Sequence, residues 1–284
     1  MTDTSHFGDR LVDALERVGS PACVGLDPVL KRMPGEIRSG RPVDAIESFC
    51  SGVLDEICER VAVVKVQSAC FERYGGEGVG VLQRVCARAA ERGLIVILDA
   101  KRGDIGISAE HYSAFAFEAC GADALTISIA MGLDTAQAYL RDDRGVFALV
   151  RTSNPGSDRV QSERLESGDT VGEHFGRLAG ELGSGLIGRA GYSSVGAVVA
   201  ATKPGDAERL RQIMPEQIFL VPGYGAQGGT LETIRHLFHA DGRGAIVTSS
   251  RGVIYPDAAP GESWRESVRG ACQRLADELR TIAA

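Results

Sequence analysis

The stretch IVILDAKRGDIG, residues 95–106, places charged side chains directly after an apolar run. An apolar run of this kind is typical of a strand that is buried on both faces, as in a parallel sheet. The charged residues that follow it are Asp99, Lys101, Arg102 and Asp104. Because a charge is costly to bury without a partner, this pattern predicts that the strand ends in a polar site.

Similar apolar runs recur along the chain, and most of the segments between them have helical periodicity. There are eight such runs, at residues 22–27, 61–67, 94–100, 123–128, 146–152, 195–201, 218–223 and 244–250. Apolar residues spaced at i, i+3, i+4 and i+7 predict helices over 43–61, 78–93 and 263–284. Alternating strands and helices imply a parallel sheet, and this number of units implies a closed α/β TIM (β/α)8 barrel. An open doubly wound sheet is the alternative.

Composition narrows the class of protein. Of the 284 residues, 44% are hydrophobic and 24% charged, and no linker divides them, so a single barrel domain over residues 1–284 is expected. The net charge of −7 argues against a nucleic-acid or anionic-membrane partner. No apolar run has the length of a membrane span, and the N-terminus lacks a secretion signal. With seven scattered cysteines and no C-x-x-C pair, a cytoplasmic location is expected.

Two further features carry weaker expectations. The polar segment 154–172 follows the fifth run, is long for a structureless connection, and is expected to cover the mouth of the barrel. His236 and His239 are spaced i, i+3 on an apparent helix, but no third ligand accompanies them. We therefore predict no metal site.

Polar residues gather where the strands of such a barrel end, which is where barrels of this kind carry their chemistry. In chain order these residues are Asp27, Lys65, Gln67, Asp99, Lys101, Ser128, Thr152 and Ser153. Asp99 and Lys101 are two apart on one strand, so both side chains are expected to face the mouth, near Lys65. Alternating charges can keep Asp99 ionised and Lys101 protonated, which suits a proton donor beside a developing carbanion. A structural ion-pair network closing the barrel is the alternative.

The last two strand ends predict a phosphate site. The glycine-rich segment 222–230 lets backbone N–H groups approach an anion, and Arg251 adds a guanidinium fork after the eighth run. Gly223, Gly225 and Gly228 also spell the dinucleotide pattern G-x-G-x-x-G. That pattern requires an acid at the end of the next strand, whereas Asp241 precedes it, so the dinucleotide interpretation is disfavoured.

Together these motifs resemble orotidine 5′-phosphate decarboxylase, and more closely its longer-chain bacterial subgroup, type 2. LDAKRGDIG matches the D-x-K-x-x-D signature of the family, and VGLDP, VVKVQSACFERYG, TSNPGS, VPGYGAQGG and SSRGVIY appear in the family's order. The resemblance implies decarboxylation of orotidine 5′-monophosphate to UMP and CO2, the last step of de novo pyrimidine synthesis, without a cofactor or metal and in a homodimer. A Mg²⁺-dependent sugar-phosphate lyase of the same suprafamily is the enzyme alternative. A nucleotide-binding regulator is the non-enzyme alternative, but it would be expected to lack Lys101 or Asp99.

The resemblance also implies a role for individual residues. Lys101 would protonate C6, Asp99 would face the substrate carboxylate, and Asp27 and Lys65 would hold the ribose hydroxyls. The other implied substrate contacts are Ser153 on the pyrimidine edge and Gln227, Arg251, Gly225 and Gly252 on the phosphate. The resemblance also implies that three residues reach the active site of the partner subunit: Asp104, Ile105 and Ser108.

The chain departs from the family pattern at two strand ends. The usual K-P-N or K-P-Q is Lys65-Val66-Gln67 here, and the usual N-P-Y or S-P-Y is Ser128-Ile129-Ala130. Each change removes a proline, so less rigid loops are expected at these points. Every charged position of the pattern is retained.

Overall fold

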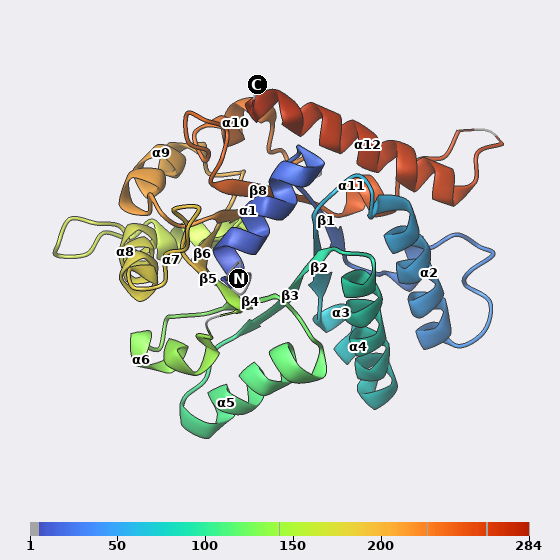
Figure 1. Ribbon diagram of the computed structural model, residues 1–284, viewed down its shortest axis with the longest axis horizontal. Coiled ribbons are helices and arrows are strands. Elements are labelled where there is room, and N and C mark those ends of the chain that lie inside the picture. The colour runs from blue at the N-terminus through green and yellow to red at the C-terminus, as the bar shows by residue number, and fades with distance from the viewer. Residues whose placement is uncertain (1–5, 142, 226, 260, 284) are drawn as a thin grey trace.

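Eight parallel strands close into a barrel in sequence order, which confirms the TIM (β/α)8 fold and excludes the open sheet (Figure 1). The computed structural model describes residues 6–141, 143–225, 227–259 and 261–283. The strands are β1 Ala22–Leu26, β2 Val63–Gln67, β3 Ile95–Arg102, β4 Ala124–Ile127, β5 Gly145–Arg151, β6 Val195–Val199, β7 Phe219–Val221 and β8 Ala245–Ser249. Each begins and ends within two residues of its expected apolar run.

Helices surround the barrel, except α1, which lies across one of its ends (Figure 1). They are α1 Phe7–Val18, α2 Pro42–Ile57, α3 Ala69–Glu72, α4 Gly75–Glu91, α5 Gly106–Ala114, α6 Leu133–Ala136, α7 Asp158–Gln161, α8 Val171–Gly183, α9 Pro204–Ile213, α10 Leu231–Arg235, α11 Arg251–Ile254 and α12 Trp264–Ala283. The helices predicted from periodicity are α2, α4 and α12. Within the described ranges, no helix is both long and apolar enough to cross a membrane.

The barrel strands are largely apolar, as burial of both faces requires, and their polar residues gather toward the carboxyl ends. Outward-facing side chains pack against the helices, while a second cluster fills the barrel interior and includes α1. The Phe7 ring of α1 meets Phe147 of β5 edge-on, with the ring centroids 6.1 Å apart. Gly145 makes room for this contact, since a Cβ there would lie 2.3 Å from the Phe7 ring. Helix α1 therefore covers the end of the barrel where the strands begin, and polar groups gather at the other end.

The polar segment 154–172, expected to cover the barrel mouth, has secondary structure of its own and packs against the end of β5. It contains the 3-10 turn Pro155–Ser157, helix α7 and the start of α8. The buried Arg151 guanidinium, at the end of β5, donates hydrogen bonds to Ser157 and Asp158 and so fixes this segment against the barrel. Within segment 154–172, the residue that lines the cavity at the barrel mouth is Asn154.

The expectation that His236 and His239 share a helix is wrong. Helix α10 ends at Arg235, so His236 is its C-cap residue and His239 lies beyond it. A ring nitrogen of His239 hydrogen-bonds the carbonyl of Pro215 at 2.9 Å. The described residues contain no group of three or more His, Cys, Asp or Glu side chains placed to hold a metal ion.

Candidate active site

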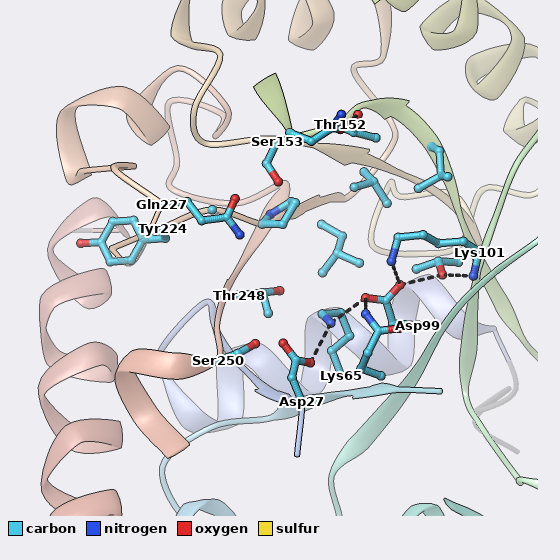
Figure 2. A pocket seen from close by; sticks show the side chains of 18 of the residues that line it. Asp27, Lys65, Asp99, Lys101, Thr152, Ser153, Tyr224, Gln227, Thr248 and Ser250 are labelled. Atoms are coloured by element: carbon cyan, nitrogen blue, oxygen red, sulfur yellow. Dashed lines mark hydrogen bonds and ion pairs between the residues drawn. The ribbon is translucent and has the colours of Figure 1, made fainter. Parts of the chain in front are cut away.

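A cavity of about 370 Å³ opens at the carboxyl ends of the strands. Its size falls within the usual range for small-molecule sites. It is lined by Asp27, Lys65, Gln67, Asp99, Lys101, Thr126, Leu149, Thr152, Ser153, Asn154, Val198, Leu220, Pro222, Gly223, Tyr224, Gln227, Thr248, Ser250 and Arg251. Figure 2 shows charged side chains at one end of this cavity and Gln227 at the other, with Ser153 on the wall between them. The cavity therefore offers chemically distinct regions to a single elongated ligand.

At the charged end, acids and bases alternate. The Asp99 carboxylate lies between two ammonium groups, with Lys65 Nζ 2.6 Å from Oδ2 and Lys101 Nζ 2.6 Å from Oδ1. The Gln67 amide donates a further hydrogen bond to Oδ2 at 3.1 Å. Asp27 extends the row, because its Oδ1 lies 3.7 Å from Lys65 Nζ (Figure 2). The order Asp27, Lys65, Asp99, Lys101 thus alternates in sign, as the sequence pattern predicted.

Mutual attraction keeps the two buried members of this row charged. Burial by itself raises the pKa of Asp99, but Lys65 and Lys101 outweigh it and hold that pKa well below its usual range. Burial likewise acts to lower the pKa of Lys65, and the carboxylates of Asp99 and Asp27 outweigh it and raise the pKa above its usual value. The Lys65 and Asp99 side chains are 7% and 8% exposed, so water screens their interaction only weakly.

Lys101 lies beside Asp99, but regular strand alternation does not place it there. The register of β3 against β4 shifts between Leu98 and Arg102, so residues 99–101 stand opposite Thr126 alone. Within this bulge Lys101 has a φ of 48°, and it is the one non-glycine residue with positive φ among those described. An L-residue adopts this left-handed conformation only when its surroundings impose it.

The opposite end of the cavity carries the predicted phosphate-binding groups. Gln227 lies at this end (Figure 2), and Arg251, the first residue of α11, is also among the residues that line the cavity. Gly223 and Gly225 have φ values of 95° and 68°, so the loop after β7 follows a path that side-chain-bearing residues rarely adopt. Gly225 and Gly252 are not lining residues themselves, but each directly follows one, Tyr224 and Arg251 respectively.

Three of the predicted site residues lie away from the cavity of their own chain. Asp104, Ile105 and Ser108 belong to the turn after β3 and the start of α5, and none of them lines the cavity. The Asp104 carboxylate accepts a hydrogen bond from the Ile105 N–H at 2.8 Å. The Ile105 side chain projects into solvent and is 64% exposed.

Sequence reasoning missed some of the cavity wall. Thr126 and Thr248 line the cavity, whereas Ser128, expected at the rim, does not. The available signal was a polar residue inside a mostly apolar strand, ALTI for Thr126 and AIVTS for Thr248. A hydroxyl within a buried run requires a polar partner, and Thr126 finds its partners, Asp99 and Lys101, in the cavity wall.

Comparison with known proteins identifies the family. The chain matches the family model described as Orotidine 5'-phosphate decarboxylase / HUMPS family over residues 20–266. The chain belongs to this family. An orotidine 5′-phosphate decarboxylase from Rhodopirellula baltica is 37% identical over 96% of this chain and 99% of the relative. One from Paracidovorax citrulli is 40% identical over 96% of this chain and 97% of the relative.

Solved structures of the orotidine 5′-phosphate decarboxylase family have the same fold. The structure of Leishmania donovani OMP decarboxylase superposes with a TM-score of 0.79 at 31% identity, covering 98% of both chains. These similarities extend over nearly the whole chain, so they include the residues that line both ends of the cavity. The resemblance drawn from the sequence motifs is confirmed.

Proposed function

We propose that this chain decarboxylates orotidine 5′-monophosphate to UMP and CO2, the last step of de novo pyrimidine synthesis. The observation that carries the proposal is the buried Asp99 carboxylate held at 2.6 Å from the ammonium groups of both Lys65 and Lys101, at the mouth of a barrel of this family. A decarboxylase must stabilise the carbanion that CO2 leaves behind. A preorganised row of charges at the barrel mouth supplies that stabilisation directly.

In the proposed reaction the bond between C6 and the carboxylate breaks, and its electron pair stays on C6 as CO2 departs. The Lys101 ammonium faces this developing charge and transfers a proton to C6, which leaves a neutral amine to be reprotonated by solvent. Asp99 faces the substrate carboxylate and fixes the ammonium through its 2.6 Å ion pair. Because the ammonium is in place before the reaction begins, little reorganisation is needed as the charge forms.

The rest of the nucleotide fits the remaining polar groups. Asp27 and Lys65 hold the ribose hydroxyls, and the buried Oδ1 of Asp27 has no hydrogen-bond partner within the described part of the chain, which suits a donor from the ligand. Ser153 binds the pyrimidine edge. The phosphate is held by Gln227, Arg251 and the N–H groups of Gly225 and Gly252. Binding energy from the phosphate, remote from C6, then helps to close the site over the reacting carbon.

Turnover of orotidine 5′-monophosphate is the direct test. The purified chain mixed with this nucleotide is expected to form UMP, followed by the change in ultraviolet absorbance and by released CO2. EDTA is expected to leave the rate unchanged, whereas a loss restored by Mg²⁺ would favour the sugar-phosphate lyase alternative. Tight nucleotide binding without any UMP formation would instead support the regulator alternative.

We also propose that the chain acts as a homodimer in which Asp104 serves the active site of the partner subunit, accompanied by Ile105 and Ser108. These three residues do not line the cavity of their own chain. Exposed apolar side chains lie in and beside this turn: Ile105 itself, Ile107 and Tyr112 of α5, and Met131, which lies next to Gly103, are between 38% and 69% exposed. A cluster of exposed apolar side chains is characteristic of an interface, and a two-fold interface would place the same turn of each chain near the site of the other.

Subunit mixing tests this arrangement. Lys101→Ala and Asp104→Ala dimers are each expected to be nearly inactive. In a mixed dimer, one active site carries both substitutions and the other carries neither. Random exchange makes about half of the dimers mixed, so about a quarter of all sites should regain wild-type activity. No recovery after verified exchange would mean that Asp104 acts in its own chain.

A further inference from the structure

Thr126 occupies a position that neither the sequence motifs nor the proposed mechanism uses. It lies on β4, it is 1% exposed, and it alone stands opposite the bulge at residues 99–101 that carries Asp99 and Lys101. A buried hydroxyl requires hydrogen-bond partners. Its partners in this structure are the two charged residues themselves.

The Thr126 hydroxyl makes one hydrogen bond to each of them. It accepts the backbone N–H of Lys101 at 2.9 Å and donates to Oδ1 of Asp99 at 3.1 Å. A hydroxyl has one donor and two acceptor sites, so both bonds can form at once. Oδ1 is also the oxygen that accepts from Lys101 Nζ at 2.6 Å. One side chain therefore fixes the main chain of Lys101 and the carboxylate to which its ammonium is paired.

The backbone of Lys101 makes this contact consequential. With a φ of 48°, Lys101 has a conformation that a side-chain-bearing residue adopts only under constraint. The hydrogen bond from its N–H to the Thr126 hydroxyl is such a constraint, because it crosses from β3 to β4 at the point where the strand register shifts. The Lys101 side chain is 48% exposed, so packing alone does not fix the ammonium.

We infer that the Thr126 hydroxyl is a positioning group for the proton transfer, which holds the Lys101 ammonium and the Asp99 carboxylate in the geometry that decarboxylation requires. The inference rests on the proposed function. Thr126 acts through the other two residues, and its loss affects the chemical step more than ground-state nucleotide binding. Displacement of a reacting group by about 1 Å can lower a rate by about 100-fold.

The test compares Thr126→Val, which keeps the side-chain shape but removes the hydroxyl, with Thr126→Ser, which keeps the hydroxyl. We expect Thr126→Val to lower kcat by at least about tenfold while KM and the Kd for UMP change by less than about threefold. Thr126→Ser is expected to retain kcat within about threefold of wild type. A structural role alone would not separate kcat from KM in this way, nor be restored by serine.

A matched control removes another buried hydroxyl from outside the cavity. Thr135 is 6% exposed and donates one hydrogen bond to the carbonyl of Gly132 at 2.7 Å, so Thr135→Val is expected to leave kcat unchanged. If Thr126→Val fails to fold, Thr126→Cys gives the same comparison, because a thiol is only a weak donor and acceptor. A kcat within twofold of wild type for the hydroxyl-free variant, or an equal loss in Thr126→Ser, would overturn the inference. An inactive wild-type chain would refute the proposed function instead.

Discussion

Replacing Asp99 by Asn should destabilise the fold strongly, because it leaves the buried Lys65 ammonium beside a neutral group. Removing one partner of a buried ion pair typically costs about 3–5 kcal/mol. Asp27 remains 3.7 Å from Lys65 Nζ and offsets part of this loss. Loss of the other ion pair, between Asp99 and Lys101, adds little to the destabilisation. The Lys101 side chain is 48% exposed, and exposed pairs contribute less than about 1 kcal/mol. We expect the free energy of unfolding to fall by about 3 kcal/mol, at the lower end of the range.

The pH dependence of this difference follows from the two shifted pKa values. Asp99 has a lowered pKa, so its stabilisation is complete above about pH 4, the value for an unfolded chain, and is lost as the pH falls through the folded pKa. Lys65 has a raised pKa, so its stabilisation is complete below about pH 10 and is lost as the pH rises through the folded pKa. The destabilisation by Asp99→Asn should therefore be constant between about pH 5 and pH 9 and shrink outside that window.

Urea denaturation followed by circular dichroism measures this effect. With a slope of about 3 kcal/mol per molar urea, the loss corresponds to a midpoint lower by about 1 M. Asp13→Asn is the matched control, since it breaks an ion pair with Arg189 in which both side chains are more than half exposed. That change should cost less than about 1 kcal/mol. A similar cost for both variants, or a marked slope with pH inside the window, would refute this account of the charge row.

Two substitutions test the ends of the cavity separately. Lys101→Ala is expected to abolish turnover while UMP still binds, because the proton donor is lost and the phosphate contacts remain. A residual kcat above about a tenth of wild type corresponds to a barrier change of only about 1.4 kcal/mol and would show that the role of Lys101 is misassigned. Arg251→Ala is expected to raise KM for the nucleotide by at least about tenfold but to leave the already poor turnover of the unphosphorylated nucleoside nearly unchanged. Equal effects on nucleotide and nucleoside would argue against a phosphate contact.

The sequence by itself determined the barrel and the identity of its charged residues. Parallel strands covered on both faces require continuous apolar runs, and all eight are visible in the sequence. A charged residue that directly follows such a run has to meet a partner or solvent, so Asp27, Lys65, Asp99 and Lys101 could be assigned to one rim before any contact was known. The family motifs then added the expected chemistry.

Only the tertiary structure decided which charges touch and how the backbone presents them. Closing the barrel brings Lys65 and Asp99, which are 34 residues apart, to 2.6 Å. The bulge at residues 99–101 breaks the two-residue alternation that the sequence argument assumed, and it gives Thr126 a partner on each side of that break. Sequence periodicity reports which face of an element is buried, but strand register and side-chain contacts arise from packing between segments distant in the chain. For that reason the charge row could be predicted from the sequence, whereas the hydrogen bonds that join Thr126 to Lys101 and Asp99 could not.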